Sequence, residues 1–470
     1  MAHNSSSPSG FSLLRTLKLG SFHIGSAFTD ILVSGVWNRI LISNLGVSAT
    51  PVAFLAALRY FIAPLTIWIG HRSDTTALLG YRRLSYIYLG RLLTWLSLPL
   101  LPLVIFELAT DQSSLVGWGL ALVIFLLYGL GTLISGAPFL ALVRESAPPA
   151  KQGLAIVMVQ TVLLFGFAVV PISYAILMKE YTPAGFWRLV GLAMLGAALT
   201  WLFSVWGEER RNIDTPRSKS AAKAQIPPTE GLTKEHTSVA SPDFMGMMRT
   251  ILAQPNTRTF FFLLSFGAIA LFAQDAILEP FGGDLFGLDV GTTTRFNAYY
   301  GTGVLLAMII GSILTRRWLP QQYTGVTAVG LLGIIVSLGM LVVAALAHIE
   351  ALLVPTLFAF GITSGIYTVG GLNLMIAMTD EEQAGTYLGL WTMAQLVFRG
   401  VGISLGGLVL DVGSALTGWQ AFGYAAVFAI EMLAALIALI LLIRLKRLGY
   451  LYTPHATPPE KKNILAMAAD

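Results

Sequence analysis

Apolar runs of about 20 residues recur along nearly the whole chain, separated by short polar segments that hold most of the charges. A helix needs a run of this length to cross about 30 Å of hydrocarbon, and in lipid the backbone must bond within its own segment. Only 11% of the 470 residues are charged, against roughly 25% in soluble domains. The sequence therefore predicts an all-α membrane protein with about twelve transmembrane helices, placed at residues 20-44, 51-70, 84-106, 116-143, 153-178, 186-206, 257-280, 296-315, 322-346, 351-377, 385-411 and 419-444.

A polar segment rich in Lys, Arg, Ser, Thr and Pro divides these spans into two sets of six. We expect an N-terminal half at 1-206, a cytoplasmic linker at 207-256, a C-terminal half at 257-446 and a cytoplasmic tail at 447-470. In membrane proteins, basic residues favour the cytoplasmic side. In this chain they collect at the span ends on the same side as the N- and C-termini, so both termini are predicted to be cytoplasmic. The basic excess suits anionic lipid headgroups of the bilayer, and no nucleic-acid partner is expected.

Several kinds of chemistry are not expected from this sequence. The chain has no cysteine, which removes disulfides, thiol nucleophiles and cysteine-ligated metals. It has no HExxH or nucleophile-elbow pattern, and its glycines lie inside apolar runs rather than in a phosphate-binding loop. We therefore predict no catalytic residue, no protein metal site and no enzyme activity.

The loop between the second and third predicted spans carries a recognisable pattern. It reads GHRSD and then, after five residues, GYRR, and its motif residues are Gly70, Asp74, Gly80, Arg82 and Arg83. This resembles the signature of the major facilitator superfamily, in which glycine permits close helix approach and the acid pairs with arginines or with a helix end. The gap is longer than usual, and Thr75 replaces a common arginine. The alternative is an ordinary positively charged cytoplasmic loop.

Three further stretches narrow the resemblance to the PucC family, a bacteriochlorophyll- and chlorophyll-associated branch of that superfamily. They are GVWNR at 35-39, QDAILEPFGG at 274-283, and YLGLW at 387-391 running on to Gln395 and Arg399. The similarity covers nearly all of the membrane portion. It implies the major facilitator fold, with two six-helix halves.

The resemblance also implies a role in assembling light-harvesting or photosystem antenna complexes. The expected cofactor is chlorophyll or bacteriochlorophyll, bound transiently. The expected partners are antenna or photosystem apoprotein helices, together with pigment-synthesis enzymes. The expected location is a photosynthetic membrane, which is either a thylakoid membrane or a cytoplasmic or intracytoplasmic membrane.

Charged residues inside apolar spans are costly and usually face an interior or a cavity. Asp275 and Glu279 are four residues apart, so we expect them on one helix face near the end of the seventh span, with Pro280 and the glycines ending the helix. Such carboxylates could bind a proton, coordinate magnesium through water, or pair with Arg39 or Arg59 of the other half. The alternative is an interior ion pair that fixes how the halves dock.

A pigment site has few histidines to use, because His23 is the one histidine inside a predicted span. A transient site could use His23, Asn38, Gln274, Gln395, a carboxylate or water, although snorkelling or helix packing is the favoured explanation of His23 alone. The pigment-binding or coupling candidates are His23, Asp30, Asn38, Arg39, Gln274, Asp275, Glu279, Gln395 and Arg399.

Two functions follow from these observations. One is a pigment-handling assembly factor, which predicts an apolar groove open to lipid. The other is a proton-coupled secondary transporter of a small solute, which predicts a polar central cleft with convergent charges.

Overall fold

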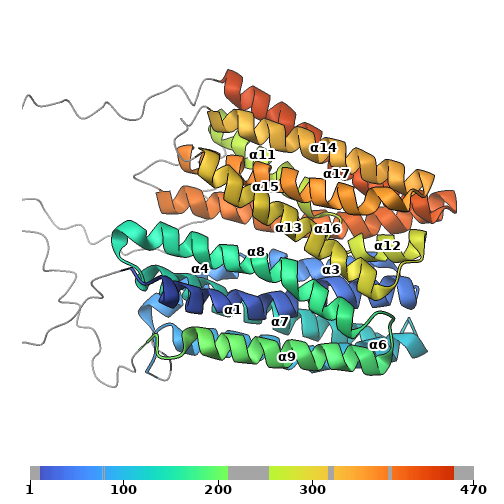
Figure 1. Ribbon diagram of the computed structural model, residues 1–470, viewed down its shortest axis with the longest axis horizontal. Helices are drawn as coiled ribbons and strands as arrows, with labels where there is room; N and C mark the ends of the chain where they lie inside the picture. The colour runs from blue at the N-terminus through green and yellow to red at the C-terminus, as the bar shows by residue number, and fades with distance from the viewer. Residues whose placement is uncertain are drawn as a thin grey trace, which may run out of the picture.

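The computed structural model describes residues 11–76, 78, 80–209, 253–315, 322–378 and 384–448. Its helices run side by side along the long axis of the molecule, with the first half of the chain in one layer and the second half in the other (Figure 1). Most of the predicted linker at 207-256 and nearly all of the predicted tail at 447-470 lie outside the described residues.

Six passages of the chain form the first half. They are built from α1 (Leu13–Ile31) with short helical turns that continue it to Asn44, α3 (Ala49–Phe61) with α4 (Leu65–Thr75), α5 (Leu84–Ser97) with α6 (Leu101–Thr110), α7 (Leu115–Glu145), α8 (Gln152–Leu177) and α9 (Pro183–Val205). Ser12, Ser114 and Thr182 cap α1, α7 and α9, because each side-chain oxygen accepts a hydrogen bond from the backbone N–H three residues later.

Six more passages form the second half. They are built from α11 (Pro255–Phe272) with α12 (Leu278–Phe286), α13 (Val290–Thr315), α14 (Gln322–Ala347), α15 (Leu353–Ala377), α16 (Ala384–Thr417) and α17 (Gln420–Arg447). Within the described residues, nine helical segments are long and apolar enough to cross a membrane, and one of them is the third passage, in which the 3-10 turn Leu98–Leu100 joins α5 to α6. The first, second and seventh passages are each broken into shorter pieces.

The breaks have identifiable local causes. Two π-helical turns, Leu32–Val36 and Ile40–Asn44, flank the short helix α2 (Trp37–Arg39) in the first passage, and such turns often mark functional positions. In the second passage the chain turns between α3 and α4 at Pro64, which has no N–H to continue a helix.

The seventh passage differs from our expectation. Pro280 and its glycines do not end a helix: α11 stops at Phe272, and α12 begins at Leu278 and runs through Pro280. The first four N–H groups of a helix have no partner within it, so a proline in the first turn costs no hydrogen bond. The helix ends instead at Gly287, which adopts φ 64°. The prediction that Asp275 and Glu279 share one helix face was therefore wrong.

The two halves meet mainly where α3 packs on α16 and α8 packs on α13. The α3 and α16 backbones approach closely at Gly407, where an added Cβ would lie 2.6 Å from the carbonyl oxygen of Ala49. Hydrogen bonds join the halves at the end opposite the start of α1 and the end of α17, such as Gly291 N–H to the Lys179 carbonyl at 2.9 Å. We call this the closed end; it lies at the α12 side of Figure 1.

Candidate functional site

A cavity of about 320 Å³ lies between the two halves near mid-span. One wall combines apolar side chains of α8 and α13, such as Leu163, Phe167 and Val304, with uncharged polar side chains of α13 and α15, such as Asn297, Tyr300 and Thr368. The other wall is polar and comes from the end of α1, from α3, from the break in the seventh passage and from α16. Its charged residues are Asp30, Arg59, Asp275 and Arg399.

Asp30 and Arg59 form the first ion pair of the cavity. The Arg59 Nη1 donates to Asp30 Oδ1 at 2.5 Å, and the Tyr128 hydroxyl donates to the same oxygen. The side chains of Asp30 and Arg59 are 20% and 18% exposed. Both partners belong to the first half, so this pair holds α1 to α3 and still presents charge to the cavity.

Asp275 and Arg399 form the second ion pair, within the second half. Arg399 Nη2 donates to Asp275 Oδ2 at 2.8 Å, and the two side chains are 29% and 27% exposed. Asp275 lies in the break between α11 and α12. The suggestion that Asp275 pairs with Arg39 or Arg59 of the other half is not borne out, because its partner comes from its own half.

The ring of Tyr60 connects the two pairs. The guanidinium carbon of Arg59 lies 4.8 Å from the ring centroid, and that of Arg399 also lies at 4.8 Å. Arg59 Nη2 also donates to the Tyr60 hydroxyl at 2.7 Å. A cation near an aromatic ring is stabilised by the ring quadrupole, so one side chain of α3 supports a cation from each half.

Glu279 lies outside the cavity and is only 2% exposed. It accepts hydrogen bonds from Thr294 at 3.0 Å and from Asn297 Nδ2 at 2.7 Å, both on α13. Gly35 of the first half packs directly against it, since an added Cβ would lie 2.2 Å from Glu279 Oε1. No ion-pair partner of Glu279 occurs among the described residues; its neighbours across the halves are packing contacts.

Arg39 explains the paired glycines of the QDAILEPFGG stretch. Its Nη2 donates to the Leu288 carbonyl at 3.1 Å, which ties the halves together at the closed end. An added Cβ at Gly283 would lie 1.9 Å from the same nitrogen, and one at Gly282 would lie 2.6 Å from the Phe296 ring. Both positions therefore require the absence of a side chain.

Gln274 lines the cavity and Asn38 lines a separate small pocket, and both amides are almost fully buried, at 2% and 1% exposed. Each NH₂ group donates to a backbone carbonyl, of Ser34 at 2.6 Å and of Leu271 at 2.9 Å. Each side-chain oxygen has no hydrogen-bond partner among the described residues. The two amides stiffen the broken helices and offer the cavity no accessible oxygen.

His23 and Gln395 are not among the residues that line the cavity. The His23 ring packs edge-on against Phe139, with centroids 5.3 Å apart. Gln395 Nε2 lies 3.2 Å from the Met375 sulfur. The structure thus groups Asp30, Gln274, Asp275 and Arg399 around one cavity and leaves these two candidates outside it.

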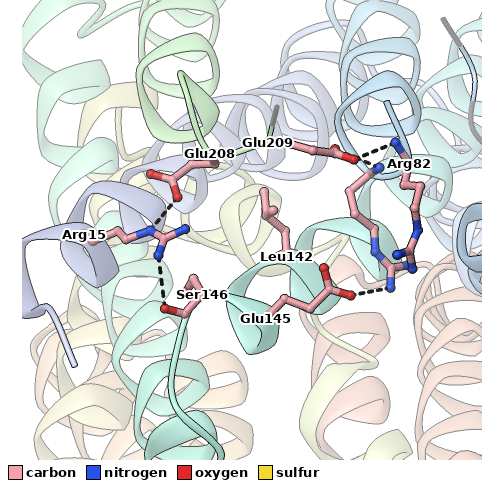
Figure 2. Close-up of a pocket in the computed structure, with 8 residues that line it drawn as sticks. Arg15, Arg82, Leu142, Glu145, Ser146, Glu208 and Glu209 are labelled. Carbon is pink, nitrogen blue, oxygen red and sulfur yellow. Dashed lines mark hydrogen bonds and ion pairs between the residues drawn. The ribbon is translucent and has the colours of Figure 1, made fainter. Parts of the chain in front are cut away.

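The GHRSD to GYRR loop forms a second charged cluster at the end opposite the closed end (Figure 2). Gly80 makes the turn with φ 84°, and the helix α4 continues through Gly70. Arg83 donates to Ser73 at 3.0 Å and to Glu145 at 2.8 Å. The side chain of Asp74 lies outside the described part of the structure, so its predicted pairing is untested.

Glu209 completes this cluster, and sequence reasoning missed it. Its carboxylate accepts the backbone N–H groups of Arg82, Arg83 and Leu84 at 2.6, 3.0 and 2.9 Å, where α5 begins. The preceding Glu208 pairs with Arg15 at 2.7 Å (Figure 2). A glutamate pair that directly follows an apolar span was the available signal.

Glu431 is the other supporting residue whose role the sequence did not indicate. It is fully buried, and its Oε1 accepts the backbone N–H of Gln274 at 2.7 Å. That N–H is released by the break in the seventh passage, so α17 stabilises the break beside Asp275. Among the described residues, no group of three His, Asp or Glu side chains could hold a metal ion, and the carboxylates that line the cavity are those of Asp30 and Asp275.

Comparison with solved structures defines the class of protein. A bacterial homologue of the human lysosomal transporter Spinster, in an inward-facing and occupied conformation, superposes with a TM-score of 0.66 at 14% identity over 95% of this chain and all of that chain. The chain is a membrane protein of the major facilitator fold, with two six-helix halves, as the sequence predicted.

The family follows from two further comparisons. The family model described as PUCC protein matches residues 36–449, and the chain belongs to the PucC family. It is 28% identical over 405 residues to the bacteriochlorophyll synthase 44.5 kDa chain of Rhodobacter capsulatus, covering 85% of this chain and 88% of that protein. It is also 26% identical over 450 residues to the protein PucC of the same organism, covering 93% of each.

Proposed function

We propose that this protein is a membrane assembly factor for light-harvesting or photosystem antenna complexes that binds chlorophyll or bacteriochlorophyll and delivers it to apoproteins. PucC family membership supports the assembly role. The proposed partners are antenna or photosystem apoprotein helices and pigment-synthesis enzymes. The proposed location is a photosynthetic membrane, with both termini cytoplasmic, and the protein acts without enzyme activity of its own.

The observation that carries the pigment role is the two-sided central cavity. The apolar side chains of α8 and α13 suit a hydrocarbon ring or chain, and the charged wall provides two part-exposed ion pairs. Small-molecule sites are mostly apolar with a few placed polar groups, and span roughly 300–1,000 Å³. At about 320 Å³, the cavity receives part of a pigment, and the remainder extends beyond it.

Oxygen donors suit magnesium, which is a hard cation. Asp30 and Asp275 are the carboxylates that line the cavity, so they are the residues that would hold the metal side of the pigment. The position of His23, packed against Phe139 outside the cavity, favours its packing role.

The second candidate is a proton-coupled secondary transporter of a small solute, and the two ion pairs favour it. Ionisable residues inside a membrane span commonly mark ion or substrate pathways, and carriers of this fold bind substrate between their halves. Convergence of Asp30, Arg59, Asp275 and Arg399 on one cavity is the charge pattern that a polar solute needs.

The test is an absorption spectrum and pigment extraction on detergent-purified protein from its native membrane. The cavity variants are Asp275→Asn and Asp30→Asn, and Gln395→Ala is the matched control on α16 outside the cavity. We expect near-stoichiometric pigment in the native protein, the same in the control, and several-fold less in the cavity variants. Pigment-free protein that still co-purifies with antenna subunits would make it a scaffold, and loss of both pigment and partner would favour the transporter.

A further inference from the structure

Asp411 of α16 binds the start of α3 across the boundary between the halves. Its carboxylate accepts the backbone N–H of Ala49 at 3.0 Å and the backbone N–H of Thr50 at 2.7 Å. It also accepts the hydroxyl of Thr50 at 2.5 Å and the hydroxyl of Ser48. A carboxylate is favoured at this position, because the first N–H groups of a helix are unpaired and carry partial positive charge.

Other hydrogen bonds between the halves that the described residues make lie at the same end, among them one from the Ser43 hydroxyl to the Pro280 carbonyl at 3.4 Å. Arg39 donates to the Leu288 carbonyl at 3.1 Å, and the Gly291 N–H donates to the Lys179 carbonyl at 2.9 Å. Unlike these single bonds, the Asp411 carboxylate receives several donors from one helix end. Among the described residues, the Asp411 carboxylate therefore accepts the largest group of hydrogen bonds between the halves.

The same two helices carry the cavity cations. Arg59 and Tyr60 lie at the far end of α3, and Arg399 lies three turns before Asp411 on α16. A ligand that binds between Arg59 and Arg399 and pushes their helices apart shifts α3 relative to α16, because the two helices pack on each other. That shift acts directly on the bonds between Asp411 and the start of α3.

We propose that Asp411 is the latch of a gate at the closed end, and that its release opens the central cavity to the membrane face opposite the chain termini. The cavity ligand then leaves or enters through that face. This activity is alternating access, and it rests on the proposed transporter function. The same opening would also let a pigment carrier release its pigment at that face. Population of the open state depends on the free energy of the latch bonds, since a two-state equilibrium shifts by the difference in stabilisation.

The cysteine-free chain allows a direct test by site-specific labelling. Ser34→Cys places a reporter in the cavity, because Ser34 lines it and is half-buried. A membrane-impermeant maleimide is applied to right-side-out and inverted vesicles that contain the full chain. Asp111→Cys marks the vesicles that present the closed end, because Asp111 is exposed in the loop after α6.

We expect Asp411→Ala to raise the labelling rate of Ser34→Cys about tenfold, equivalent to about 1.4 kcal/mol, and only in vesicles that present the closed end. Asp111→Ala is the matched control. Hydrogen bonds from the Ser113 hydroxyl and N–H lower the pKa of Asp111; this aspartate lies at the same end as Asp411 but bonds within its own loop. Its replacement should leave the labelling rate unchanged.

An unchanged labelling rate in folded, monodisperse Asp411→Ala would overturn the latch, as would an equal rise from both faces. If Asp411→Ala does not fold, Asp411→Asn and Thr50→Val replace it, since each removes some of the hydrogen bonds between Asp411 and the start of α3. Each should raise labelling about threefold, equivalent to about 0.65 kcal/mol, and no rise in either would reject the proposal. The assay needs no pigment, so its failure is distinct from a failure of the pigment role.

Discussion

Arg59 and Arg399 approach one aromatic ring from opposite halves of the molecule, each with its guanidinium carbon 4.8 Å from the centroid of Tyr60. Each arginine is also paired with an aspartate of its own half. The two cations therefore share one ring, whose quadrupole stabilises each of them. The contribution of the ring can be measured apart from that of its hydroxyl.

The variants Tyr60→Phe and Tyr60→Leu distinguish the contribution of the ring from that of the hydroxyl. Tyr60→Phe keeps the ring and loses the 2.7 Å bond from Arg59, so we expect a loss of about 1 kcal/mol. Tyr60→Leu also removes the ring, and we expect a further loss of about 1–2 kcal/mol. Equilibrium unfolding in mixed micelles measures both values, and equal losses in the two variants would show that the ring contributes nothing.

The Asp275 and Arg399 pair should behave as one unit in a double-mutant cycle. Asp275→Asn and Arg399→Gln each leave a charge without its partner in a partly buried site. Removal of one partner of a fully buried pair costs about 3–5 kcal/mol; with each side chain over a quarter exposed, we expect about 1–3 kcal/mol for each single variant. The double variant should lose less than the sum of the singles. Additive losses in the unfolding titration would mean that the two groups are independent.

Gly283→Ala should destabilise the protein because its Cβ would overlap Arg39. An added Cβ there would lie 1.9 Å from Arg39 Nη2, and overpacking of this kind costs about 1–3 kcal/mol. The matched control is Gly371→Ala on α15, where a Cβ meets nothing within 4 Å and alanine favours the helix by up to about 1 kcal/mol. Thermal unfolding of the two variants should therefore shift in opposite directions.

Glu209→Ala should release the start of α5. The carboxylate holds three consecutive backbone N–H groups there, and loss of a capping side chain costs about 0.5–2 kcal/mol. Hydrogen exchange at residues 82–84 should accelerate by about threefold to thirtyfold, as that loss implies. Glu208→Ala removes only the bonds to Arg15 and Lys18, so its exchange at 82–84 should stay near the native rate.

The sequence predicted the spans well, because about twenty apolar residues in a row leave few alternatives to a crossing helix. It predicted the pairing of charges poorly. Asp275 and Glu279 are four apart, but the unexpected break after Phe272 separates them, so Asp275 reaches Arg399 and Glu279 reaches α13. Proline marked the region correctly; the helix stops earlier, where the buried Glu431 accepts a backbone N–H.

The cavity candidates were recognisable as intramembrane charges, whereas their grouping was not. Which of these charges line the same cavity depends on how the two six-helix halves dock, and no local sequence pattern encodes that docking. Asp30 and Asp275 face one cavity while His23, only seven residues before Asp30, packs against Phe139. Two helical turns along α1 were enough to change the surroundings from a shared cavity to the interior of one half.

Glu209 is the last described residue before the connection between the two halves, and its carboxylate also completes α5. The connection is therefore anchored to the third passage as well as to the sixth. A force that displaced Glu209 would therefore act on the start of α5 and on the arginine loop beside it.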